Sequence, residues 1–345
     1  MNNFLFDHEN MEKYWNCDVR TYDEWVALAR PNLGIGLLYL AIGLTYLMIY
    51  IPCWISLIKS ELLNFSAYKF MAFLGVIDFL GLLNATFYYF YACTIGMVYC
   101  MSPTLNYVMG VWTFFGWAAS STTCVLLAIS RCIDFISPKT GRLLYMGHKT
   151  YYWFLIPFFY SIHIICVAGS CTFNSVTYAC SFDPFYGLPE RMGQMDTEHY
   201  PHQTLAIHNL AIPIILIIIY SALGIILAAQ TRGIHGMKSR NLGKAQRNMM
   251  FQAMLICSVS FIGALLYSYS NFFPVGKLYT IMGQIGLLSV HGLPGVTYLL
   301  FNKTIRGDVI SIFCRNHAPA LSPKVTPGTT SINNVHVTTS SNQAY

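Results

Sequence analysis

Residues 33–57 read LGIGLLYLAIGLTYLMIYIPCWISL, a run without a charged side chain. A helix needs about 20 mostly apolar residues to cross the hydrocarbon core of a bilayer, so this run predicts a transmembrane helix. Six further, mostly apolar runs follow at residues 70–92, 104–131, 151–172, 205–229, 248–270 and 278–301. The sequence therefore predicts an all-α integral membrane protein, a bundle of seven transmembrane helices over residues 33–301.

The composition indicates that most of the chain is taken up by the transmembrane helices and their short connections. Of the 345 residues, 55% are hydrophobic and 10% are charged. We expect an amino-terminal segment at residues 1–32, a short amphipathic helix on the membrane surface at 302–314, and a disordered tail at 315–345. The tail is rich in Ser and Thr, so it is a candidate for phosphorylation and for recognition by arrestin. Cys314 ends the amphipathic helix and is a candidate for palmitoylation.

Charge placement predicts the orientation. Most of the 20 Lys and Arg residues fall in segments on one side of the predicted spans, and basic residues near span ends are retained in the cytoplasm. The other side carries only Lys13, Arg20, Arg30, Arg191 and Lys277. This imbalance predicts that the amino terminus lies outside the cell. Short basic loops beside a bilayer are explained by lipid headgroups, so no nucleic-acid partner is predicted.

The cysteines on the outer side can form disulfides, because that compartment is oxidising. They are Cys17, Cys93, Cys100, Cys171 and Cys180. We expect Cys100, just before the third span, to pair with Cys180 in the loop between spans four and five. Cys171 is the competing partner. Such a bridge would hold the loop over the outer mouth of the bundle.

The third span ends in Ala128-Ile-Ser-Arg131-Cys132-Ile-Asp134-Phe-Ile-Ser-Pro138. This resembles rhodopsin-like receptors, in which an Arg ends the span and a Pro follows seven residues later. Ser130 stands where that family has an acid, and Asp134 is one helical turn away from Arg131, where it could replace that acid. The resemblance implies that Arg131 contacts a G protein when the bundle opens. A basic residue that only sets topology remains the alternative.

The seventh span offers a second resemblance to these receptors in Pro294-Gly-Val-Thr-Tyr298-Leu-Leu-Phe-Asn302-Lys-Thr-Ile-Arg306. The Tyr-to-Asn-to-Arg spacing is kept, whereas the Pro is one residue too far from Tyr298. A Pro bends a helix and lets its inner half move as a unit. We therefore predict that Pro294, Tyr298, Asn302 and Arg306 belong to an activation switch with Arg131, Asp134 and Pro138; a kink without a switching role is the alternative.

Asp78 falls well inside the second span, where an acidic side chain is costly and calls for partners. In rhodopsin-like receptors an acid at this depth joins a polar cluster with spans three and seven. Ser120 and His291 stand at the corresponding depths. We predict a buried polar cluster of Asp78, Ser120 and His291.

A narrower resemblance, to the nematode serpentine chemoreceptors of class T, rests on five short motifs. They are Trp15-Asn16-Cys17, Glu24-Trp25, Tyr99-Cys-Met-Ser-Pro103, Ser130-Arg-Cys132, and His291-Gly-Leu-Pro294 joined to Tyr298 and Phe301-Asn302. The resemblance implies a G-protein-coupled receptor in the plasma membrane of sensory cilia. Its partners would be a small-molecule ligand and a heterotrimeric G protein.

The outer half of the bundle holds aromatic side chains with a few polar tips, which is typical of small-ligand sites. Thr113 stands where amine receptors place an Asp, so a biogenic amine is not expected. The ligand-binding candidates are Tyr88, Tyr89, Thr113, Trp117, His208, Tyr267 and Tyr279.

Other classes of protein fit less well. A transporter or channel usually carries polar residues at mid-membrane in several spans, and an enzyme would need a cluster of catalytic carboxylates or metal ligands, which the sequence does not offer. We therefore predict no enzymatic activity, no cofactor and no metal site. A transporter or channel, or a non-chemosensory receptor for a peptide or small molecule, is the alternative function.

Overall fold

The computed structural model describes residues 8–189, 203–232, 255, 258, 262–270, 273 and 275–314. The described chain is helical apart from one small hairpin and the connecting loops. In order, its elements are α2 (His8–Tyr14), α3 (Tyr22–Ala27), α4 (Leu33–Lys59), η1 (Glu61–Asn64), α5 (Ser66–Leu83), η2 (Asn84–Tyr88), α6 (Tyr89–Ile95), η3 (Tyr99–Met101), α7 (Pro103–Ile136), α8 (Pro138–Tyr145), α9 (Lys149–Trp153), α10 (Leu155–Ala168), β1 (Thr172–Asn174), β2 (Ala179–Ser181), α11 (Gln203–Arg232), α13 (Lys277–Phe301) and α14 (Lys303–Cys314).

Six of the predicted spans appear as helical stretches long and apolar enough to cross a membrane. They cover Leu33–Lys59, Ser66–Ile95, Pro103–Asp134, Lys149–Ala168, Gln203–Ile226 and Lys277–Phe301. The remaining predicted span, 248–270, lies mostly outside the described residues, although 262–270 are helical. The basic segment 231–247, which we expect to form the third inner loop, lies outside them beyond Arg232, and so does the tail, 315–345.

The fourth span ends earlier than its hydropathy predicts. Gly169 follows α10 with a φ of 78° and a ψ of −132°, a conformation that is open mainly to glycine and does not continue the helix. The apolar residues after it then enter β1, which pairs antiparallel with β2 through Phe173 opposite Cys180. The hydrophobic run therefore continues past the helix, and this explains the error in the predicted boundary at 172.

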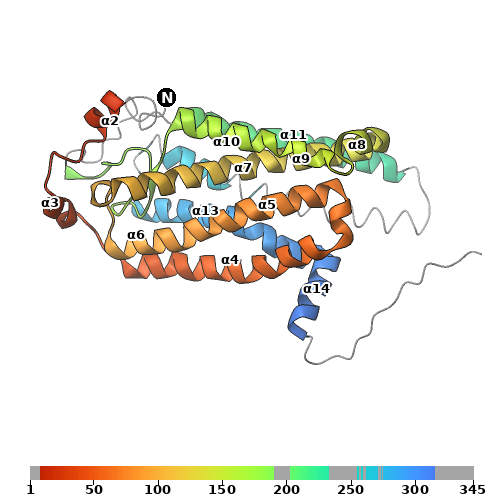
Figure 1. The fold of residues 1–345 in the computed structure, drawn as a ribbon, viewed down its shortest axis with the longest axis horizontal. Helices are drawn as coiled ribbons and strands as arrows, with labels where there is room; N and C mark the ends of the chain where they lie inside the picture. The colour runs from red at the N-terminus through yellow and green to blue at the C-terminus, as the bar shows by residue number, and fades with distance from the viewer. Residues whose placement is uncertain are drawn as a thin grey trace, which may run out of the picture.

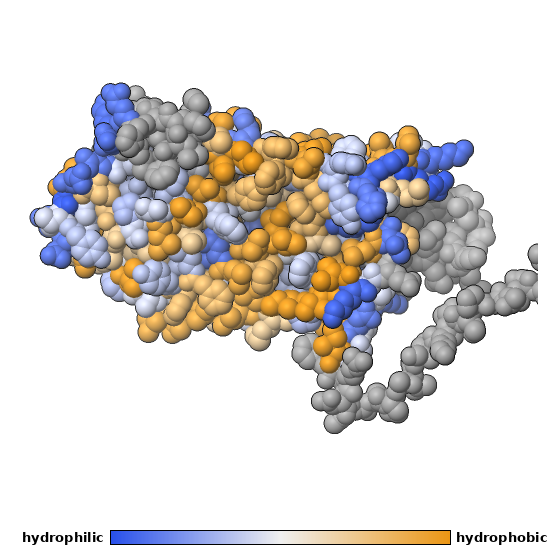
Figure 2. Space-filling model, in the orientation of Figure 1, coloured by the Kyte–Doolittle hydropathy of each residue, from blue (hydrophilic) through white to orange (hydrophobic). Residues whose placement is uncertain are grey.

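The long helices run side by side along the long axis of the molecule (Figure 1). Within the bundle, α4 packs on α13, and α7 packs on α5, α10 and α11. One end carries α3 and the β1–β2 hairpin, and we call it the disulfide end; the other carries α8 and α14, and we call it the α14 end. Figure 2 shows hydrophobic side chains across the middle of the visible face and hydrophilic ones toward both ends, the pattern that a membrane-spanning bundle requires.

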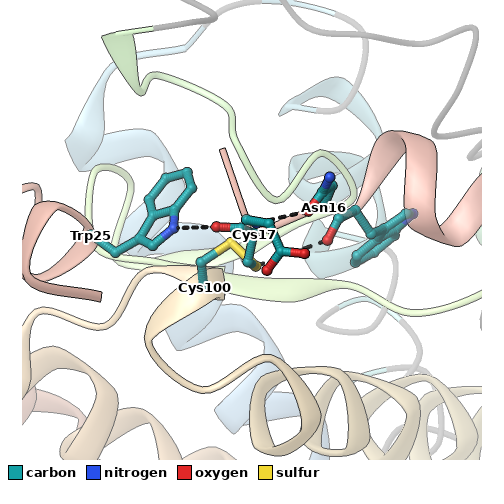
Figure 3. Close-up of a disulfide and its surroundings, with 6 residues drawn as sticks. Asn16, Cys17, Trp25 and Cys100 are labelled. Carbon is teal, nitrogen blue, oxygen red and sulfur yellow. Dashed lines mark hydrogen bonds between the residues drawn. A yellow bond between two sulfur atoms is a disulfide. The ribbon is translucent and has the colours of Figure 1, made fainter. Parts of the chain in front are cut away.

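A disulfide between Cys17 and Cys100 fixes the amino-terminal segment to the bundle (Figure 3). Trp25 supports it, because its indole Nε1 donates a hydrogen bond to the carbonyl oxygen of Cys17 at 2.9 Å. The expected Cys100–Cys180 pair is therefore wrong. The segment before α4 folds back over the bundle and takes Cys100, while β2 turns Cys180 toward Cys171 and Tyr89.

We predict that Cys17→Ala lowers the free energy of unfolding by about 2–4 kcal/mol, because the bridge restrains a long stretch of unfolded chain. Its cysteines are 83 positions apart. Cys100→Ala should cost a similar amount, and the double variant no more than either single one. Equilibrium unfolding of the purified protein measures this, with the free Cys166 replaced by Ala as the control. Additive costs for Cys17 and Cys100 would contradict the pairing.

At the α14 end, α14 leaves the bundle at an angle to α13 (Figure 1). Asn302 caps it, because its Oδ1 accepts from the backbone N–H groups of Thr304 and Ile305 at 3.1 and 3.2 Å. Ile305 and Val309 are buried against the bundle. The predicted amphipathic pattern at 302–314 thus corresponds to a helix with one face packed inward.

Candidate functional site

A pocket opens at the disulfide end of the bundle, and the space in it that no atom fills, open solvent included, is about 530 Å³. Its walls come from α7, α11, α13 and the helical residues 262–270, and the β1–β2 hairpin region covers one side. Apolar and aromatic side chains predominate in its lining, as they do in small-ligand sites. Its lining residues are Thr113, Phe114, Trp117, Cys171, Cys180, Phe182, Leu205, Asn209, Gly263, Ala264, Tyr267, Leu287 and Val290.

The cavity is apolar and uncharged. None of the described lining residues carries an acidic or basic side chain, and the polar atoms that face it come from a few residues such as Thr113, Asn209 and Tyr267. A charged ligand would lose its hydration here without an ion-pair partner, which is costly. The described lining therefore suits a neutral ligand with few hydrogen-bonding groups.

Neighbouring side chains hold each polar group of the lining in place. Asn84 Nδ2, in the π-helical turn η2, donates to Thr113 Oγ1 at 3.0 Å. The Trp117 indole donates to Asn209 Oδ1 at 2.8 Å. On the other wall, Tyr267 Oη donates to Gln284 Oε1 at 2.6 Å. The rings and hydroxyls at the wall are therefore pre-positioned, which lowers the entropy that ligand binding would cost.

Three of the seven predicted ligand-binding candidates line this cavity: Thr113, Trp117 and Tyr267. His208 lies behind the wall, because Ser121 and Tyr160 occupy its two ring nitrogens at 3.0 and 2.8 Å. The other three are placed differently. Tyr88 donates to Asn106 at 2.8 Å, Tyr89 contacts Cys180, and the Tyr279 ring lies 5.6 Å from that of Tyr269.

Sequence reasoning missed several lining residues. Phe114 could have been found from helical spacing, because residues 113, 114 and 117 share a face of α7. Asn209 is the neighbour of the predicted His208, and its polar side chain inside an apolar run was a usable signal. Cys171, Cys180 and Phe182 reach the cavity through the hairpin, which gave no comparable signal.

A second cavity lies deeper in the bundle, and we call it the deeper cavity and the first one the upper cavity. Trp117 and Val290 line both cavities, so they stand between them. The deeper cavity also touches Ser120 and Pro294, two residues of the predicted polar cluster and switch. Trp117 therefore separates the upper cavity from the polar centre of the bundle.

The predicted polar cluster is brought together in that centre. Asp78 is fully buried, and its Oδ1 contacts His291 Nδ1 at 2.9 Å and accepts from Ser120 Oγ at 3.2 Å. Tyr50, which sequence reasoning did not include, donates to Asp78 Oδ2 at 2.9 Å. His291 is therefore placed to partner a carboxyl group that would be costly to bury alone.

Comparison with known proteins identifies the chain. Residues 1–320 match the family of serpentine type 7TM GPCR chemoreceptors, Srt. The chain belongs to the Srt chemoreceptor family. It is also 26% identical over 305 residues to serpentine receptor class T-55 of Caenorhabditis elegans, covering 87% of this chain and 81% of that protein. The class T resemblance predicted from the sequence is thereby confirmed, and with it a multi-pass membrane protein of a receptor family.

At the α14 end of this Srt chain, the predicted switch residues occupy several different environments. The Arg131 guanidinium lies over the Tyr68 ring, 6.0 Å from its centroid. Asp134 accepts from Ser66 Oγ at 3.4 Å and also interacts with Arg131 through their opposite charges, so the replacement of the missing acid by Asp134 stays a prediction. Pro138 begins α8 after the capping residue Ser137.

The seventh-span part of the predicted switch is packed against α4. Tyr298 is buried, with its ring 6.4 Å from that of Tyr50. A Cβ on Gly295 would meet the Tyr50 side chain and backbone at 2.8–3.1 Å. Close packing therefore joins Tyr298 to a residue that donates to Asp78, whereas Arg306 lies beyond it and donates to the Leu300 carbonyl at 3.3 Å.

Proposed function

We propose that this Srt receptor binds a small neutral organic molecule in the cavity at the disulfide end and signals to a heterotrimeric G protein at the α14 end. The observation that carries the proposal is the apolar cavity with its pre-positioned Thr113, Trp117 and Tyr267. It lies in a protein of a chemoreceptor family.

The orientation follows from two supports that are independent of each other. The Cys17–Cys100 disulfide belongs in an oxidising compartment, which for a plasma-membrane protein is the outside. The predominance of basic residues in the predicted inner segments agrees with this direction. In this orientation the cavity faces the surroundings of the cell, and Arg131 and α14 face the cytoplasm.

Ligand binding and activation would be linked through Trp117. A ligand in the upper cavity would press on an indole that also lines the deeper one. The deeper cavity touches Ser120, a partner of Asp78, and Pro294, a proline inside α13. A ligand that binds one arrangement of Trp117 more tightly would shift the bundle toward that arrangement. The movement of α13 beyond Pro294 would then open the face around Arg131 and Tyr298.

The remaining predicted features complete the proposal. We infer that α14 lies on the inner membrane surface with Cys314 as a palmitoylation site, and that the tail beyond it recruits arrestin when phosphorylated. We also infer that the receptor resides in the ciliary membrane of a nematode sensory neuron. A fluorescent fusion expressed in the animal tests the location.

Filling part of the cavity should weaken the response. We predict that Ala264→Phe, which adds a ring to a buried lining position, excludes about five ligand atoms worth ~0.3 kcal/mol each. Ligand potency should fall roughly tenfold or more. Calcium imaging of cells that express the receptor measures it, with a panel of neutral alcohols, ketones and esters beside amines and carboxylates.

The matched control is the neighbouring Leu265→Phe. Leu265 is exposed on the outer surface of the same helical stretch, so the added bulk should leave the response unchanged. Surface delivery of both variants is measured with an epitope tag. An equal response of the Ala264→Phe variant to activating compounds, or activation confined to charged compounds, would contradict the proposed site.

A further inference from the structure

The segment that covers the cavity contains two cysteines whose sulfur atoms meet. Cys171 immediately precedes β1, and Cys180 lies in β2 opposite Phe173. Both side chains line the cavity. Their Sγ atoms are 2.6 Å apart, and both belong to the cysteines outside the Cys17–Cys100 bridge.

This separation is too short for two packed thiols. Non-bonded carbon atoms keep about 3.5–4.0 Å between them, and sulfur is a larger atom. A covalent S–S bond is about 2.05 Å long, so the two sulfurs lie nearer to bonding distance than to contact distance. The two side chains already point toward each other.

A shared metal ion explains the contact less well. Two thiolates on one tetrahedral Zn²⁺, with Zn–S bonds of about 2.3 Å, stand roughly 3.8 Å apart. The described residues also contain no group of three His, Cys, Asp or Glu side chains that could hold a metal ion. The geometry therefore favours a direct bond between the sulfurs over a bridging metal.

These cysteines lie at an end of the bundle that is exposed to an oxidising compartment during synthesis. The Cys17–Cys100 disulfide lies at the same end of the bundle, and Phe182, which closely follows Cys180, belongs to the same hydrophobic cluster as Cys100 and Trp25. A chain that acquires the first bridge passes through a compartment that can oxidise the second pair.

We propose that Cys171 and Cys180 form a second disulfide, which closes the β1–β2 hairpin over the cavity. The two thiols give up two protons and two electrons to the disulfide of a secretory-pathway oxidoreductase, which leaves as a dithiol. The reaction proceeds through a mixed disulfide, so one S–S bond forms in the receptor as one is lost from the donor.

The bridge would fasten the base of a hairpin whose other end is already held. Asn106 of α7 accepts from Phe173 N at 2.7 Å and donates to its carbonyl oxygen at 3.1 Å. Thr280 of α13 donates to the Thr177 carbonyl at 2.6 Å, and Tyr39 of α4 donates to that of Tyr178 at 3.0 Å. With its ends joined, the hairpin becomes a fixed wall of the cavity.

Peptide mapping without reduction tests the proposal on the unmodified receptor. The protein is unfolded in detergent with N-ethylmaleimide, which alkylates free thiols, and is then digested with trypsin. No Lys or Arg lies between residues 150 and 190, so Cys166, Cys171 and Cys180 share the peptide 150–191. We expect this peptide to carry one adduct, on Cys166, and to be two hydrogen atoms lighter than its fully reduced form.

The same digest also tests the Cys17–Cys100 disulfide. Peptides 14–20 and 70–131 contain Cys17 and Cys100, and they should be found linked to each other. Three adducts on peptide 150–191 would overturn the proposal, as would a link between that peptide and 70–131. Cys166 is a built-in control, because it is free and must be labelled under every outcome.

A variant pair supplies the second measurement. In Cys171→Ala the proposal requires Cys180 to become alkylated, whereas in Cys166→Ala the 171–180 bridge must persist and peptide 150–191 must carry no adduct. An unlabelled Cys180 in the Cys171→Ala variant would overturn the pairing. Because the digest of the unmodified chain is decisive on its own, misfolding of a variant does not weaken the test.

Discussion

Replacing His291 with Ala is expected to destabilise this receptor by about 3–5 kcal/mol, the cost of leaving a buried ionisable group without its partner. Asp78 is fully buried, and His291 Nδ1 lies 2.9 Å from its Oδ1. Ser120 and Tyr50 would still donate to the carboxyl group, but neither can neutralise its charge. Equilibrium unfolding of the purified receptor in denaturing detergent measures the loss.

A matched replacement separates this effect from the loss of a histidine in general. His163 lies in α10 on the exposed surface of the bundle, so His163→Ala removes the same side chain without disturbing the cluster, and we expect it to change stability by less than about 0.5 kcal/mol. Equal losses in the two variants would show that Asp78 and His291 are not paired.

Asp78→Asn offers a second check through a double-mutant cycle. The amide removes the charge and keeps an oxygen that can accept from Tyr50 or Ser120. In the His291→Ala background it should therefore restore part of the lost stability, so the double variant should be more stable than the sum of the single costs predicts. Additive costs would argue that the two side chains are neighbours without energetic coupling.

The predicted cluster illustrates what a sequence determines well in a membrane protein. An acidic residue inside an apolar run must find partners, and helical depth limits the candidates, so Ser120 and His291 could be named in advance. Tyr50 was not named, because an aromatic hydroxyl in a span is equally compatible with an interfacial anchor. The rotation of α4 that turns Tyr50 toward Asp78 depends on its packing against Gly295, which no local pattern shows.

The bridge of Cys100 shows the opposite case. Spans and their limits follow from bilayer thickness, but disulfide pairing follows from how loops fold over the bundle. The amino-terminal segment supplies Cys17 because Trp15 and Trp25 pack it into the cluster around Tyr99 and Tyr107. Those aromatic residues were visible in the sequence. Their docking onto the bundle was not, since it depends on tertiary contacts between distant segments.

The cavity lies between these two cases. Thr113 and Trp117 were predictable because both share a face of α7 near the outer end, where small-ligand sites occur. His208 was predicted for the same reason, yet Ser121 and Tyr160 occupy both of its ring nitrogens. Depth along a helix can be read from the sequence, whereas a shift of one residue, from His208 to Asn209, decides which side chain lines the cavity.

Replacing Arg131 with Ala is expected to reduce G-protein signalling roughly ten- to hundredfold at unchanged surface level, a loss comparable with typical allosteric coupling energies. In the structure the guanidinium lies over the Tyr68 ring, a contact that a cation makes without an acidic partner. A movement of α13 and its neighbours away from α7 would free this group. Its several donors would then be available to the backbone of a G protein.

The decisive comparison is with Arg142→Ala. Arg142 is an exposed residue of α8 at the same end, so its loss removes one positive charge from the inner face without touching the bundle interior. If signalling depended only on the basic character of that face, both variants would weaken it alike, and topology would be the whole role of Arg131. A selective loss in Arg131→Ala, measured as second-messenger output per receptor at the surface, would instead show that the position matters. Arg131→Lys should then restore only part of the signal, because Lys keeps the charge and loses the planar set of donors.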